Sequence, residues 1–251
     1  MLWGNLKLNY LIKVTLLGLF FGTFGTTIGG IIGVNIKTKS NKLLSFILEF
    51  AAGLMMAIIC FDLIPEAFET FSIITAFCGL LLGVTCMIFF NGIIQNKFNQ
   101  KVYSSNSLLK TGILVAIGLA FHNFPEGIAI GSGFGASLKL GYSLAMAIAF
   151  HDVPEGIVMA VPMKAGGMNK TKVLVYTILS GVTTGIGALF GGIIGNISND
   201  AISICLGFAA GAMLYIVSGE LVPESKKLYK GRFAACGNIL GFVIGLIATS
   251  L

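Results

Sequence analysis

Long apolar stretches recur along the chain, and short polar connections separate them. A helix that crosses a bilayer needs about 20 predominantly apolar residues, and eight stretches reach this length. They lie near residues 14–34, 44–66, 71–93, 108–131, 138–162, 171–195, 201–223 and 233–251. Their side chains are apolar throughout, whereas the strands of a membrane barrel alternate between apolar and polar residues. We therefore predict an all-α membrane protein with eight transmembrane helices, forming one domain over residues 1–251.

The composition agrees with a membrane protein, because 56% of the residues are hydrophobic and 10% are charged, against about 25% charged residues in soluble domains. Most of the 16 basic residues fall in or beside the connections after the first, third, fifth and seventh spans. By the positive-inside rule these connections are cytoplasmic, which predicts a multi-pass plasma-membrane protein with both termini outside. The net charge of +6 thus reflects topology, and no soluble basic module indicates a nucleic-acid partner.

Two segments of the chain repeat each other. Residues 50–66 read FAAGLMMAIICFDLIPE, residues 208–224 read FAAGAMLYIVSGELVPE, and the motif GGIIG occurs at 29–33 and again at 191–195. Span one therefore matches span six and span two matches span seven, so the copies cross the membrane in opposite directions. This predicts an inverted repeat of spans 1–3 and 6–8 around spans 4–5, an arrangement common in secondary transporters, whose substrate sites lie near the bilayer midplane.

Glycines recur at every fourth position in several spans, as in residues 25–33, 127–135, 187–195 and 237–245. Small residues at this spacing allow membrane helices to approach closely. The glycines lie inside spans, and the chain has no G-x-x-x-x-G-K-[ST] motif for phosphate binding. We therefore expect them to form helix interfaces.

Two similar hexapeptides lie inside the fourth and fifth spans: HNFPEG at residues 122–127 and HDVPEG at residues 151–156. They contain both histidines of the chain and three of its 10 acidic residues. Each ionisable group at the centre of a membrane helix costs roughly 2.5–3.5 kcal/mol on insertion scales, so such groups are functional by default. Histidines grouped with carboxylates are typical of a site for a divalent metal ion.

The spacing places the donor side chains on one face of each helix. His122 and Glu126 are four residues apart, as are His151 and Glu155, so each pair shares a face. These four side chains are enough to bind one transition-metal ion. Asn123 and Asp152, one position further round, are harder oxygen donors that could hold a second ion with the two glutamates. The donor set favours Zn²⁺, Fe²⁺ or Mn²⁺ over Ca²⁺, and without thiolates it suits exchangeable binding of a metal substrate.

Acidic residues also mark the ends of the two repeated spans. Asp62 and Glu66 end the second span at the outer face, and Glu220 and Glu224 end the seventh at the inner face. We expect them to form an entrance and an exit for cations. Helix capping and solvation at the interface are the alternative, and for Glu66 and Glu224, close to water, this alternative is favoured.

The hexapeptides, the eight spans, the outside termini and the repeated FAAG-x-M segments resemble the ZIP family of divalent-metal transporters over the whole chain. The resemblance implies a binuclear metal site, movement of metal toward the cytoplasm, and an elevator-like motion of spans one, four, five and six against the others, often in a homodimer. The implied metal ligands in the two hexapeptides are His122, Asn123, Glu126, His151, Asp152 and Glu155. The resemblance also implies Met55 as an additional, soft ligand. Core packing is the equal alternative for Met55.

One position departs from the family pattern. Members of the family often carry Ser-Gly-x-x-Glu-Pro in span six, where the glutamate serves the second metal. This chain has Ser180-Gly181-Val182-Thr183-Thr184-Gly185, with Thr184 in place of that glutamate. The resemblance therefore predicts a weaker second metal position.

Two other functions are compatible with a metal cluster inside a membrane. An intramembrane zinc-dependent hydrolase would use a metal-bound water with Glu126 or Glu155 as the base, but the chain has no H-E-x-x-H motif. A non-transporting scaffold would use the cluster only to hold helices together. We predict a transporter and not an enzyme, with no cofactor and with Zn²⁺, or a related ion such as Fe²⁺, Mn²⁺ or Cd²⁺, as the substrate.

Overall fold

The computed structural model describes residues 2–36, 40–101 and 107–249. These residues form helices and contain no strand, which confirms the predicted all-α class. The helices are α1 (Leu2–Asn35), α2 (Asn41–Ile58), α3 (Ile64–Thr70), α4 (Ile73–Lys101), α5 (Ser107–Ala136), α6 (Leu138–Ala165), α7 (Lys170–Gly195), α8 (Asn199–Ile216), α9 (Val222–Leu228) and α10 (Phe233–Thr249).

In the described residues, six helical segments are long and apolar enough to cross a membrane: those at 8–35, 41–70, 73–92, 138–165, 170–195 and 199–228. The chain is therefore a multi-pass membrane protein. Helix α10 is apolar but shorter, and α5 is not among the six, so the count of eight spans stays a prediction. Several helices are longer than the predicted apolar stretches, as α1 is at its start.

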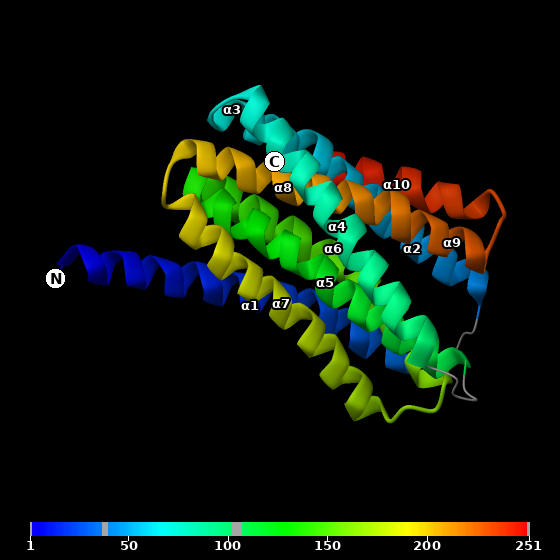
Figure 1. The fold of residues 1–251 in the computed structure, drawn as a ribbon. Coiled ribbons are helices and arrows are strands. Elements are labelled where there is room, and N and C mark those ends of the chain that lie inside the picture. Colours follow the sequence, from blue (N-terminus) through cyan, green and yellow to red (C-terminus); the bar gives the residue numbers. More distant parts are fainter. Residues whose placement is uncertain (1, 37–39, 102–106, 250–251) are drawn as a thin grey trace.

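The helices divide into two groups, which Figure 1 shows on either side of the central pair α5 and α6. Helices α1 and α7 pack against this pair from one side and against each other, whereas α2, α4, α8 and α10 lie on the other side. The glycine rows form interfaces as expected. A Cβ added to Gly25 would meet the backbone of α6, and one added to Gly131 would meet that of α7. The group of α1, α5, α6 and α7 is therefore joined by direct backbone contacts.

Two π-helical segments, η1 (Ile59–Leu63) and η2 (Val217–Leu221), join α2 to α3 and α8 to α9. Each of the two repeated sequence segments thus lies in one continuous helical rod, α2–η1–α3 or α8–η2–α9. The bounds of η1 and η2 correspond residue for residue in the register of the sequence repeat. Each is followed by a proline, Pro65 or Pro223, in the first turn of the next helix. A proline cannot donate a backbone hydrogen bond and crowds the preceding turn, and a wider π turn relieves this. The sequence analysis did not predict these segments.

The two repeated rods run in opposite directions. The Ser45 hydroxyl near the start of α2 lies 2.8 Å from the Ser225 hydroxyl in α9. At the other end, the Ser203 hydroxyl near the start of α8 donates to the Ala67 carbonyl in α3 at 2.7 Å. The start of each rod thus contacts the end of the other, the relation expected of an inverted pair.

A buried carboxylate, absent from the functional expectations, joins α2, α9 and α10. Glu49 is 3% exposed and accepts hydrogen bonds from Ser225 Oγ at 3.1 Å and Asn238 Nδ2 at 3.0 Å. Its Oε1 also lies 3.1 Å from the Lys226 ammonium. Because these partners satisfy both oxygens, Glu49 serves packing at this end of the bundle.

We expect Glu49→Gln to lower the free energy of unfolding by roughly 1–2 kcal/mol, since it removes hydrogen bonds to a charged acceptor. Thermal unfolding of the purified protein in detergent measures the change. Glu69→Gln is the matched control, because Glu69 is exposed. Equal unfolding temperatures for the two variants would contradict a stabilising role for Glu49.

Candidate metal centre

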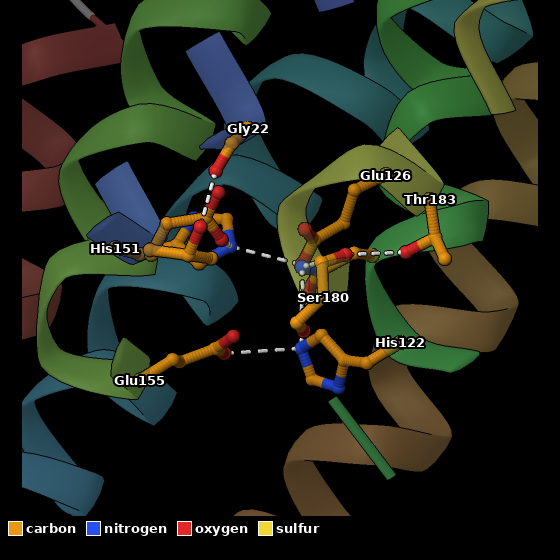
Figure 2. Close-up of polar contacts among 10 residues, drawn as sticks. Gly22, His122, Glu126, His151, Glu155, Ser180 and Thr183 are labelled. Atoms are coloured by element: carbon orange, nitrogen blue, oxygen red, sulfur yellow. Dashed lines mark hydrogen bonds and ion pairs between the residues drawn. The ribbon is translucent and has the colours of Figure 1, made fainter. Parts of the chain in front are cut away.

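The two hexapeptides face each other where α5 and α6 cross the middle of the bundle. Figure 2 shows His122 and Glu126 on one side of the cluster and His151 and Glu155 on the other. Every predicted donor of the two hexapeptides is at most 1% exposed: His122, Asn123, Glu126, His151, Asp152 and Glu155. Prolines 125 and 154 lie inside these helices and cannot donate a backbone hydrogen bond, which frees a carbonyl one turn earlier. All six predicted donors are therefore buried inside the bundle, and their role as metal ligands stays a prediction.

One carboxylate oxygen lies between the two histidines. Glu126 Oε1 is 3.2 Å from His122 Nε2 and 2.9 Å from His151 Nε2. On the opposite side, Glu155 Oε1 is 3.1 Å from the same His122 nitrogen. Ligand atoms of Glu126, His151, Asp152 and Glu155 all lie within 4.8 Å of one another. An ion with bonds of about 2.0–2.2 Å needs only small side-chain shifts to bind such a group.

Several atoms of the cluster are buried without a hydrogen-bond partner among the described residues. They include both carboxylate oxygens of Asp152, Oε2 of Glu126 and Oδ1 of Asn123. An unsatisfied buried polar group costs about 1–3 kcal/mol, and more when it is charged. Three carboxylates gathered around two imidazoles, with lone pairs free, form a site whose chemistry fits a divalent cation.

Helix α7 contributes a contact that the sequence analysis did not predict. Asn123 Nδ2 donates to the Ser180 carbonyl at 3.1 Å and reaches the Ser180 hydroxyl at 3.3 Å. This contact uses the amide nitrogen and leaves Oδ1 of Asn123 without a partner among the described residues. The Thr184 hydroxyl, one turn further along α7, is buried with no partner in the described part of the chain. In the sequence, the only signal for this segment was its resemblance to the Ser-Gly-x-x-Glu-Pro pattern, which begins at Ser180.

The other predicted residues lie outside this group of six. Met55 is completely buried and packs in the main apolar core, so its role as a ligand stays a prediction. Asp62 is half-buried, and its Oδ2 has no hydrogen-bond partner in the described residues. Glu66 is half-buried in the first turn of α3. None of the three is shown to contact the cluster.

The two acids of the other repeat have clear partners. Glu220, in η2, accepts a hydrogen bond from Asn91 Nδ2 at 3.1 Å, and the same amide donates to the Tyr215 hydroxyl at 3.0 Å. Glu220 also faces α5 at Gly118, one turn before His122. Glu224 pairs with Lys227 at 2.9 Å on the exposed surface. Glu220 therefore faces α5 one turn before the predicted ligand His122, whereas Glu224 lies at the surface.

Comparison with known proteins agrees with the resemblance seen in the sequence. A family model described as "ZIP Zinc transporter" matches residues 96–251. "Zinc transporter ZupT" of Clostridium perfringens is 31% identical to the chain, and the alignment covers 99% of each protein. The ZupT proteins of Corynebacterium glutamicum (31% identity; 92% of the chain and 96% of the relative) and Campylobacter jejuni (32%; 96% and 97%) are also similar. These relatives are named as transporters rather than enzymes, as the sequence predicted for this chain. The chain belongs to the ZIP family of zinc transporters.

Proposed function

We propose that this protein moves divalent transition-metal cations across the plasma membrane toward the cytoplasm, through the cluster between α5 and α6. Zinc is the first expected substrate, with iron, manganese and cadmium as further candidates. The observation that carries the proposal is the buried group of two histidines and three carboxylates. Five of the six carboxylate oxygens have no hydrogen-bond partner among the described residues. The relatives named zinc transporters support the choice of metal.

The division of the helices supports an elevator-like mechanism. Helices α1, α5, α6 and α7 carry the cluster and contact each other through glycines. In the proposed motion this group slides as a unit against α2, α4, α8 and α10, exposing the cluster to each side in turn. We further propose that both termini lie outside and that two copies form a homodimer. Met55 would add a sulfur ligand to the metal in one of the two end states of the sliding motion.

The proposed cation path uses the acids of the two π-helical segments. Asp62 in η1 would receive the ion from outside, and Glu220 in η2 would receive it from the cluster on the way out, with Glu66 and Glu224 at the two mouths. The support is the buried Oδ2 of Asp62, which has no hydrogen-bond partner among the described residues, and the position of Glu220 facing Gly118, which lies one turn before His122. π turns inside α-helices frequently occur at functional sites.

Glu220→Gln is expected to slow zinc uptake by about tenfold, because a neutral amide attracts a cation far less than a carboxylate does. The equilibrium affinity of the cluster should remain close to that of the wild type, since Glu220 is not a ligand of the resting site. Glu69→Gln is the matched comparison, because Glu69 is an exposed carboxylate outside the proposed path. Equal rates for the two variants would contradict an exit role for Glu220.

Uptake of radiolabelled Zn²⁺ into liposomes that contain the purified protein tests the proposed function. We expect saturable uptake that excess Cd²⁺, Fe²⁺ or Mn²⁺ reduces, and none in protein-free liposomes. The measurement is repeated with a pH gradient and with a membrane potential of either sign, so that a requirement for a driving force is not mistaken for inactivity. Uptake equal to the protein-free level under all of these conditions would refute transport.

A further inference from the structure

An apolar groove of about 410 Å³ opens on the surface of the bundle between α2, α6 and α10. Its walls include Phe46 and Phe50 of α2, Val153 and Pro154 of α6, and Leu240 of α10. Phe150, also in the wall, is 61% exposed, and Leu240 is 46% exposed. The groove therefore opens toward the lipid and not into the centre of the protein.

Every side chain of the groove wall is apolar, so the chemistry of the groove fits a hydrocarbon chain. The groove lies at the seam between the two groups of helices, because α6 belongs to the cluster-bearing group and α2 and α10 to the other. Val153 and Pro154 are sequence neighbours of Asp152 and Glu155. A hydrocarbon chain in the groove would thus pack against the same turn of α6 that carries metal ligands.

A positive charge stands at one end of this groove. The Lys42 ammonium lies 4.5 Å from the centroid of the Phe233 ring, and the Phe233 ring stacks on that of Phe46 with the centroids 5.0 Å apart. Phe46 in turn lines the groove. Lys42 is exposed, and no carboxylate of the described residues is within ion-pair distance of it. Arg232, next to Phe233, is exposed at the same end.

We propose that this groove binds an anionic phospholipid, with an acyl chain between α2, α6 and α10 and the phosphate at Lys42 and Arg232. The aromatic pair Phe46 and Phe233 would lie at the boundary between the chain and the headgroup. Basic pockets between membrane helices bind anionic headgroups on the cytoplasmic side. This end of the bundle is also the lysine-rich end, which the positive-inside rule assigns to the cytoplasm.

Native mass spectrometry of the full chain in detergent tests this site, with phosphatidylglycerol and phosphatidylcholine of identical acyl chains added in turn. We expect one phosphatidylglycerol to be retained in preference to phosphatidylcholine. Lys42→Ala should weaken its retention about five-fold, the contribution of one basic residue near an anionic surface. Leu240→Trp, which fills the groove, should weaken retention of both lipids.

Two variants serve as matched controls. Lys227→Ala removes another exposed lysine, one that pairs with Glu224, and Ile239→Trp enlarges a side chain that is 64% exposed and lies outside the groove. Both should retain the lipid as the wild type does. If Leu240→Trp does not fold, Lys42→Ala alone decides, because Lys42 lies outside the core.

Equal retention of the two lipids by the wild type, or equal losses in Lys42→Ala and Lys227→Ala, would overturn the proposal. A second result would also overturn it: Leu240→Trp dissociates a dimer while lipid retention is unchanged. This would show that a second copy of the chain occupies the groove. The measurement does not depend on metal transport, so its outcome is independent of the proposed function.

Discussion

Glu126→Gln is expected to lower the affinity of the protein for Zn²⁺ by at least about 100-fold and to reduce uptake to the level of protein-free liposomes. Glu126 Oε1 is the atom that approaches both histidines, at 3.2 and 2.9 Å. Glutamine keeps the size of the side chain but cannot supply two negatively charged oxygens. Residues that only support a metal ligand already contribute 10–100-fold to affinity, so the loss of a central ligand should exceed that range.

Equilibrium dialysis with radiolabelled Zn²⁺ measures the affinity in detergent, and the liposome assay measures uptake. Glu69→Gln is the control, because it removes an exposed carboxylate and the same charge. The unfolding temperature of metal-free Glu126→Gln shows whether the variant is folded. A folded variant that binds and transports zinc as the wild type does would refute the assignment of the cluster.

The helices and the buried group of hexapeptide side chains could be predicted from the sequence because the relevant patterns are local. Continuous apolar stretches of spanning length can satisfy their backbone hydrogen bonds only as helices or a closed barrel. Within each hexapeptide, the spacing of four residues places histidine and glutamate on one face. Two such faces with unfavourable polar groups must meet each other, since the lipid cannot solvate them.

The contacts around the cluster could not be predicted, because they join residues far apart in the chain. Asn123 binds Ser180 across 57 residues, and Glu220 binds Asn91 across 129. No periodicity within a single helix contains this information. Such contacts depend on how far one helix is shifted along another, and here that shift is fixed by where glycines allow backbones to touch.

The π-helical segments illustrate a different limit. The positions of Pro65 and Pro223 indicate that the regular helix is interrupted, but they do not determine the kind of interruption. A proline inside a span can kink the helix, end it or widen one turn. Which of these occurs is decided by packing: residues such as Ile59 and Leu63 are completely buried on both sides of Asp62.

The packing of α1 behind the cluster leads to a second strong expectation, that Gly29→Ala destabilises the protein although alanine favours helices. A Cβ at Gly29 would collide with the Val153 carbonyl oxygen and stand 2.8 Å from the Gly156 Cα. Both neighbours belong to the second hexapeptide, so α6 must move. Overpacking of this kind costs typically 1–3 kcal/mol, and displaced ligands should lower zinc affinity by about tenfold or more.

Gly92→Ala provides the matched control, because a Cβ added to Gly92 in α4 meets nothing within 4 Å. Alanine there should stabilise the helix by up to about 1 kcal/mol and leave zinc affinity unchanged. The same substitution should therefore change the unfolding temperature in opposite directions at the two sites, whereas in equilibrium dialysis only Gly29→Ala should lower zinc affinity. If Gly29→Ala instead behaved as Gly92→Ala does, α1 would not be in backbone contact with α6, and the metal ligands of α6 would not depend on that contact for their position.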